Sequence, residues 1–242
     1  MSIEEIRSLC VKYSIEDYII NDDGSIDVEH NVDLSYALSN MNKLPLKFNK
    51  VNGNFGCFNN NLETLEGSPK YVKGTFDCSG NKLTSLKYCP EKVDKNFICS
   101  DNIITSLEGC PQNIEGLFYC HFNKLTTLKG GPESISKDFS CWDNHLISLE
   151  GCPKYVGGDF NCEDNKITDL KESPKYVGGD FNCVNNPIGF ISDEIDIEFI
   201  RAFNTFKVLK DNTINLKRLK YIMGIFDKPI IIGRIKIYYK IK

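Results

Sequence analysis

A group of aromatic and acidic side chains lies where the alternation of apolar residues predicts that they face outward from short strands. The aromatic group, which includes a leucine and a histidine, comprises Leu117, Tyr119, His121, Phe122 and Trp142. The acidic group comprises Asp138, Asp143, Asp159, Glu163 and Asp164. Exposed Tyr and Trp dominate the energetics of protein interfaces, and a contiguous apolar surface usually marks a contact site. We therefore predict that these residues form a partner-binding site.

Two alternatives to this prediction are open at the level of the sequence. Trp142 and Phe122 could fold over the edge of a strand and pack only on each other or on a cap. The carboxylates could serve to keep the surface soluble, rather than to speed the approach of a basic partner. The spatial arrangement of the side chains bears on both alternatives.

Catalytic and metal chemistry have little support in the residue pattern. The chain has 11 cysteines, but most recur in two repeated positions, one of which also accepts Ser or Gly, so these positions select for small size. Zinc ligands usually come in close Cys or His pairs, which this sequence lacks. The 3 histidines have no matched nucleophile, and there is no phosphate-binding loop or dinucleotide fingerprint. We expect no enzymatic activity, no cofactor and no metal.

The charge is divided between an acidic body and a basic C-terminal segment. Residues 207–242 contain ten Lys or Arg and two Asp or Glu, whereas the whole chain has a formal net charge of -4. Such asymmetry is typical of contact with nucleic acid or an acidic partner, or of docking between the two regions. The basic residues considered for a nucleic-acid contact are Lys217, Arg218, Lys220, Arg234 and Lys236.

A repeat of twenty-one residues must position all of the candidate side chains. Its core reads F-x-C-x-x-N-x-L-x-x-L-x-x-x-P-x-x-V; its Phe, Cys and Asn recur in seven successive copies without insertion or deletion, and its Pro recurs in six of them. The copies begin at Phe55, Phe76, Phe97, Phe118, Phe139, Phe160 and Phe181. Units of this length are too small to bury their own apolar face, so they stack on their neighbours and form a solenoid.

Each position of the unit has a structural interpretation. F-x-C describes a short strand whose Phe and Cys point inward and whose flanking residues point outward. The Asn lies where the backbone turns, and its amide can satisfy backbone groups that a tight turn leaves unpaired. The Pro of the return side disfavours helix. We therefore predict one parallel sheet and an irregular return side.

An N-terminal cap is expected over residues 1–32. A helix should follow Ser2, whose hydroxyl and the carboxylate of Glu5 have the spacing of a capping box. Two short strands, at 18–20 and 25–28, are separated by a turn signal. This cap would cover the open end of the stack.

The solenoid is predicted to span residues 33–191 and to be followed by a basic cap over 192–242. Its first copy is imperfect, with Leu34 assigned to the Phe column, Tyr36 to the Cys column and Ser39 to the Asn column. Atypical terminal copies are normal in repeat arrays. The elements expected in the C-terminal cap are helices over 192–206 and 215–226 and a strand over 230–242.

The core of the unit resembles the leucine-rich repeat family, whose consensus is L-x-L-x-x-N-x-L-x-x-L. Residues 76–86 match it with Phe and Cys in the first two places. The short period and the Pro are similar to the bacterial effector subclass, and the whole unit resembles repeat proteins of large tailed phages and giant viruses. The resemblance, which covers about residues 33–191, implies an α/β solenoid with a parallel sheet on a concave face that recognises a macromolecule.

These observations predict a non-enzymatic module that binds another protein through its concave face, and the resemblance suggests a viral protein that inhibits or tethers a host protein. One alternative is a role with nucleic acid, either through the basic cap or through an acidic face that mimics DNA. Another is a structural component of a virion. We expect a cytoplasmic protein, because no stretch approaches the ~20 apolar residues of a membrane span and the N-terminus lacks signal-peptide features. The sequence does not specify the partner or the oligomeric state.

Overall fold

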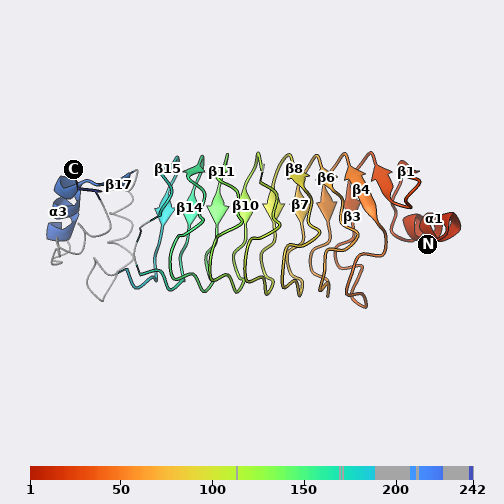
Figure 1. The fold of residues 1–242 in the computed structure, drawn as a ribbon, viewed down its shortest axis with the longest axis horizontal. Coiled ribbons are helices and arrows are strands. Elements are labelled where there is room, and N and C mark those ends of the chain that lie inside the picture. The colour runs from red at the N-terminus through yellow and green to blue at the C-terminus, as the bar shows by residue number, and fades with distance from the viewer. Residues whose placement is uncertain are drawn as a thin grey trace.

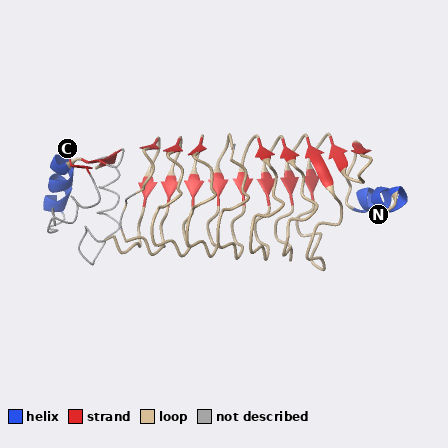
Figure 2. Ribbon diagram, in the orientation of Figure 1, coloured by secondary structure: helices blue, strands red, loops and turns tan. Residues whose placement is uncertain are grey.

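A computed structural model describes residues 1–112, 114–168, 170, 172–188, 208–210, 213–225 and 240–241 of the 242-residue chain. The repeats form the successive coils of a solenoid, which follow one another in a straight row in the view of Figure 1. Two rows of short strands run along this stack, and Figure 2 shows them on different sides of each coil. The predicted solenoid with a parallel sheet is confirmed.

The main sheet takes one strand from each coil, in the order β16-β14-β12-β10-β9-β7-β5-β3. Every Phe lies directly beside the Phe of the next coil, as Phe118 does beside Phe139. The twenty-one-residue period is thus the register of a parallel ladder. The strands are β3 (Val32–Asp33), β5 (Phe55–Gly56), β7 (Phe76–Asp77), β9 (Phe97–Ile98), β10 (Phe118–Tyr119), β12 (Phe139–Ser140), β14 (Phe160–Asn161) and β16 (Phe181–Asn182).

The return side is more regular than we predicted, because it contains short strands as well. They form a sheet in the order β1-β2-β4-β6-β8 and a second sheet in the order β11-β13-β15. The Pro of each unit precedes the strand, so its missing N–H is not needed in the ladder. The strands are β1 (Tyr18–Ile20), β2 (Ile26–Val28), β4 (Phe48–Val51), β6 (Tyr71–Val72), β8 (Lys92–Val93), β11 (Ser134–Ile135), β13 (Tyr155–Val156) and β15 (Tyr176–Val177).

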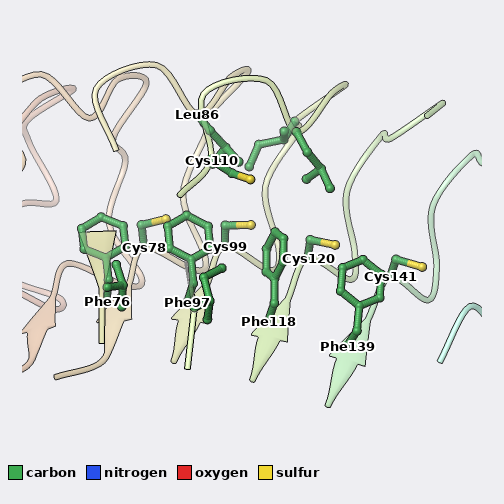
Figure 3. Close-up of a cluster of buried hydrophobic side chains, with 14 of the residues drawn as sticks. Phe76, Cys78, Leu86, Phe97, Cys99, Cys110, Phe118, Cys120, Phe139 and Cys141 are labelled. Carbon is green, nitrogen blue, oxygen red and sulfur yellow. The ribbon is translucent and has the colours of Figure 1, made fainter. Parts of the chain in front are cut away.

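The core between the two rows of strands consists of stacked columns of identical or closely similar side chains. Figure 3 shows the Phe and Cys of four successive coils side by side in the interior. Phe97, Phe118 and Phe139 are fully buried. The ring of Phe118 stands edge-on to both neighbours, with interplanar angles of 79° and 86°, whereas the rings of Phe139 and Phe160 are stacked at 12°.

The Asn column holds each coil to the one before it. The side-chain Nδ2 of Asn123 donates to the carbonyl oxygens of Cys99 and Cys120 at 3.0 and 3.2 Å, and its Oδ1 accepts from the backbone N–H of Ile104 at 3.0 Å. The same pattern occurs from Asn81 to Asn186. A buried amide with both donors and acceptor satisfied by backbone explains why no other residue type occupies this position in the repeats.

The N-terminal cap forms as predicted. Helix α1 (Ile3–Lys12) begins with a capping box, in which the N–H of Glu5 donates to Ser2 Oγ at 3.2 Å and the N–H of Ser2 donates to Glu5 Oε2 at 2.7 Å. Strands β1 and β2 form an antiparallel hairpin. Ile6 and Cys10 of the helix are buried, so α1 covers the end of the core.

The first coil begins two residues earlier than we predicted. Val32, not Leu34, lies beside Phe55 and so occupies the Phe column. Leu34 takes the Cys column, Tyr36 takes the outward place that Asn59 has in the next coil, and Ser39 is exposed. The prediction was wrong because this coil is twenty-three residues long, from Val32 to Phe55, which conceals its register with the later copies.

Only part of the C-terminal cap belongs to the described residues. Helix α3 (Leu216–Ile225) confirms the helix predicted over 215–226. The helix predicted over 192–206 lies outside the described residues, as does most of the strand predicted over 230–242. The described strands form one sheet in the order β17-β18-β19, and they are β17 (Leu209–Lys210), β18 (Thr213–Ile214) and β19 (Lys240–Ile241).

Candidate functional site

The outward side of the main sheet, here called the strand face, has three columns of side chains. The first column lies between Phe and Cys and comprises Asp33, Gly56, Asp77, Ile98, Tyr119, Ser140, Asn161 and Asn182. The second follows Cys and comprises Ser35, Phe58, Ser79, Ser100, His121, Trp142, Glu163 and Val184. The third comprises Tyr36, Asn59, Gly80, Asp101, Phe122, Asp143, Asp164 and Asn185.

Four of the predicted residues form one contiguous group, here called the aromatic cluster: Tyr119, His121, Phe122 and Trp142. The imidazole of His121 lies at its centre, with ring centroids 5.6 Å from Tyr119, 5.7 Å from Phe122 and 5.3 Å from Trp142. The rings of Phe122 and Trp142 meet edge-to-face at 4.2 Å. The cluster arises because Tyr119, His121 and Phe122 belong to one coil and Trp142 to the next.

Trp142 and Phe122 do pack on each other, as one of the alternatives stated. This contact nevertheless leaves part of the cluster exposed to solvent. Phe122 remains 43% exposed. Tyr119, His121 and Trp142 are half-buried. The cluster therefore exposes ring surface to solvent while its members hold one another in place.

The backbone at Phe122 is unusual for its residue type. The third column has a left-handed backbone throughout, with φ between 49° and 63°. Asn, Asp or Gly fills it except at Tyr36 and Phe122, because these residues tolerate this conformation best. A bulky side chain there costs on the order of 1 kcal/mol. Phe122 is thus exposed and conformationally unfavourable at the same time, which indicates selection for something other than stability.

His121 links the aromatic cluster to the preceding coil. Its Nδ1 lies 3.2 Å from the hydroxyl of Ser100. Desolvation by the surrounding rings lowers the pKa of His121, and the carboxylate of Asp101 opposes this only in part. The neutral imidazole is therefore the form that the site favours.

We expect NMR titration to place the pKa of His121 below the ordinary value of about 6.5. The pKa of His121 is lower in the folded state than in the unfolded state, so its neutral ring contributes to the stability of the fold at pH values above the unfolded-state pKa. This contribution is lost as the pH falls through the folded-state pKa. The ring Cε1 proton reports the titration, and the variant His121→Gln assigns its signal. A midpoint at or above 6.5 would contradict the desolvated position of this ring.

The acidic residues divide into two groups that the sequence did not distinguish. Asp138 Oδ1 accepts from the N–H of Asp159 at 2.9 Å, and Asp159 Oδ1 accepts from the N–H of Asp180 at 2.7 Å. In the same column, Asn54 Oδ1 accepts from the N–H of Thr75 at 2.8 Å, so an acceptor at this position joins one coil to the next. Asp138 and Asp159 thus have a structural use, although Tyr119 also donates to Asp138 at 3.5 Å.

The other three acidic candidates lie on the strand face itself. Glu163 and Asp164 accept from Asn182 and Asn185 at 2.9 and 2.7 Å, and Asp143 is exposed beside the aromatic cluster. Leu117 precedes the cluster and is half-buried, in the same column as Asp138.

The strand face is acidic, because its three columns contain carboxylates but no Lys or Arg. No ion pair within the described part of the chain involves any of these carboxylates, which are Asp33, Asp77, Asp101, Asp143, Glu163 and Asp164.

Three of the basic candidates for a nucleic-acid contact are exposed on α3. They are Lys217, Arg218 and Lys220, whereas Leu219 and Ile222 of the same helix are buried. Arg234 and Lys236 lie outside the described residues.

The cysteines are free thiols, and all but Cys89 are buried. Burial raises the pKa of Cys110 and Cys152 to about 12, so these thiols are protonated at neutral pH and unreactive. Among the described residues no group of three His, Cys, Asp or Glu side chains could hold a metal ion. No helix in that part of the chain is long and apolar enough to span a membrane.

The fold and the site define the class of this protein as a parallel β-solenoid with an aromatic cluster and an acidic strand face. A scan against protein-family models and a search of curated proteins each returned no match. The resemblance to the leucine-rich repeat family therefore stays a prediction, and function has to be inferred from the residues themselves.

Proposed function

We propose that this chain is a non-enzymatic interaction module that binds another protein through the strand face, with the aromatic cluster as its anchor. The observation that carries the proposal is Phe122, a large apolar side chain that is exposed at a position where it is conformationally costly. Residues that lower stability and face solvent are typical of binding sites. Trp142 and Tyr119 beside it are the residue types that contribute most at protein interfaces.

The charge of the strand face supports a partner with a basic surface. Four of the six carboxylates, Asp101, Asp143, Glu163 and Asp164, lie in the coils of the aromatic cluster or next to them, without a cation on the same face, and give this region a negative charge. Such a charge steers a basic partner during encounter and repels an acidic one. For the same reason, the strand face is unsuited to binding nucleic acid directly.

The resemblance to phage and giant-virus repeat proteins extends this proposal to a biological setting. On this interpretation the chain is a viral protein that acts in the host cytoplasm and inhibits or tethers a host protein. The proposal for the strand face does not depend on that setting.

Affinity purification with single-residue variants tests the proposal. The wild-type chain, Trp142→Ala and Phe122→Asn are each used as bait in extract from cells that naturally contain the protein, with quantitative mass spectrometry. We expect a protein partner whose recovery falls roughly 30-fold with Trp142→Ala, the loss typical of an interface residue worth about 2 kcal/mol. Phe122→Asn should also reduce recovery, although its unfolding free energy should stay within about 1 kcal/mol of wild type, since relief of backbone strain offsets the lost ring contact.

The matched control is Tyr176→Ala. Tyr176 is an exposed aromatic residue on β15, away from the strand face, and is 45% exposed. This variant should recover the partner at the wild-type level. If Trp142→Ala and Phe122→Asn both retained full recovery, the strand face would not be the binding surface.

A further inference from the structure

The strand face carries a second aromatic pair, which our predictions from the sequence missed. Tyr36 and Phe58 meet edge-to-face, with ring centroids 5.5 Å apart and an interplanar angle of 81°. Tyr36 is 69% exposed, and its hydroxyl accepts a hydrogen bond from Asn59 Nδ2 at 2.7 Å. Its assignment to the inward Cys column had concealed it, and only the register of β3 with β5 places it on the surface.

This pair repeats the arrangement of Phe122 and Trp142. Tyr36 and Phe122 both occupy the third column, with φ of 59° and 52°. Phe58 and Trp142 both occupy the second column of the following coil. In each pair the backbone N–H of the third-column residue donates to the carbonyl of its aromatic neighbour, at 3.1 Å for Tyr36 and 3.2 Å for Phe122.

The two pairs lie four coils apart along one sheet, because Phe58 follows β5 and Trp142 follows β12 in the order β12-β10-β9-β7-β5. Adjacent strands of a sheet are separated by about 4.8 Å, so four coils correspond to roughly 19 Å. The second and third columns between the pairs hold small or acidic residues, which are Ser79, Gly80, Ser100 and Asp101. The first column of the same interval adds Asp77 and Ile98, so the two aromatic pairs flank a stretch that is mostly small and acidic.

We infer that the strand face holds one extended segment of a partner protein at two points, with an apolar side chain on each aromatic pair and basic side chains between them. This inference rests on the proposed function and adds the class of ligand. The bulky residues at the two left-handed positions are its main support, because the same backbone cost is accepted twice in the same geometry.

The spacing favours an extended segment over a helix. In an extended chain, side chains six residues apart point the same way and span about 20 Å. In an α-helix, about 13 residues span the same distance with side chains about 140° apart, whereas the same-facing spacings of about 11 and 14 residues span about 17 and 21 Å and match it less closely. The carboxylates of Asp77 and Asp101 lie in the interval and favour Lys or Arg between the two apolar anchors.

Synthetic peptides of defined spacing test the inference with the full chain. Two fluorescein-labelled peptides of identical composition, made of Lys, Ser and two Trp, place the tryptophans six or four residues apart. Fluorescence anisotropy measures their affinities. We expect the six-residue spacing to bind at least tenfold more tightly, because both anchors are then engaged at once. A third peptide, with Glu in place of Lys, should bind more weakly than either.

Protein variants then separate this inference from the proposed function. Phe58→Ser and Tyr36→Asn introduce the residues that the neighbouring coils have in the same columns, so the fold is retained. Each should abolish the advantage of the six-residue spacing, whereas Tyr88→Ser, an exposed tyrosine off the strand face, should not.

Three results would contradict the second anchor or the binding role of the strand face. Equal affinity for the two spacings, or an advantage that survives Phe58→Ser, would overturn the second anchor. If Trp142→Ala weakened the binding of both peptides while Phe58→Ser had no effect, the proposed function would be supported but the second anchor would not. If neither peptide bound at about 1 mM, or no variant altered binding, the binding role of the strand face would fail as well.

Discussion

Asn123→Ala is expected to lower the free energy of unfolding by roughly 3–5 kcal/mol. The substitution leaves the N–H of Ile104 without the acceptor that it has in the buried amide. It also removes one of the two amide donors to each of the carbonyls of Cys99 and Cys120, which still accept from Asn102 and Asn144 at 3.3 and 3.1 Å. The buried N–H without a partner costs about 1–3 kcal/mol, and each of the two lost hydrogen bonds to the carbonyls adds about 0.5–1.5 kcal/mol. Because the coils of a solenoid stabilise only their neighbours, the damage in this central coil weakens the interface to the coil before it. Urea denaturation followed by circular dichroism measures the loss.

Two companion variants make the result interpretable. Lys124→Ala changes the next residue, which is exposed, and should stay within about 0.5 kcal/mol of wild type. Asn123→Asp keeps the acceptor for Ile104 but loses the amide donors and buries a carboxylate, so it should destabilise the fold at neutral pH at least as much as Ala does. A loss below about 1 kcal/mol in Asn123→Ala would show that the Asn column is not what joins the coils.

Phe118→Ala should cost a similar amount, about 3–5 kcal/mol, for a different reason. Its ring is fully buried and packs edge-to-face against the rings of Phe97 and Phe139, with centroid distances of 5.3 and 5.4 Å. Truncation leaves a cavity that these neighbours cannot fill, because each is held in register by its own strand. Thermal and urea unfolding both measure the effect.

Phe118→Leu is the matched control for this core position. It keeps most of the volume and should cost less than half as much as Ala. Equal losses for Leu and Ala would mean that ring contacts, rather than the cavity, dominate the stability of the Phe column.

The columns of the core could be predicted from the sequence because a solenoid makes tertiary contacts periodic. Each coil packs on copies of itself, so a residue twenty-one places away in the chain is a neighbour in space. Phe55 and Cys57, which were predicted to point inward, are accordingly buried, and so is Asn60, which was predicted to lie at the turn. The same periodicity predicts that Tyr119 and His121 lie close to Trp142, because Trp142 belongs to the next coil.

Where the periodicity fails, the prediction fails with it. The longer first coil shifted the register by two residues, so Tyr36 was assigned to the interior although it is exposed. Strands β6, β8, β11, β13 and β15 of the return side were missed because two-residue strands that follow a proline leave no alternation to detect. The structural use of Asp138 and Asp159 depends on which backbone N–H lies opposite them, which a list of acidic residues does not contain.

The sequence by itself determined the solenoid, its period, its inward columns and the coils in which aromatic residues gather, because all of these depend on local alternation and on identical neighbours. Only the tertiary structure decided the left-handed backbone of Phe122, the desolvated environment that favours neutral His121, and the equivalence of the two aromatic pairs. These features depend on the direction of a side chain at one turn and on the register of coils of unequal length. Both are set by hydrogen bonds between coils, as in the bond from Phe122 to the carbonyl of Trp142.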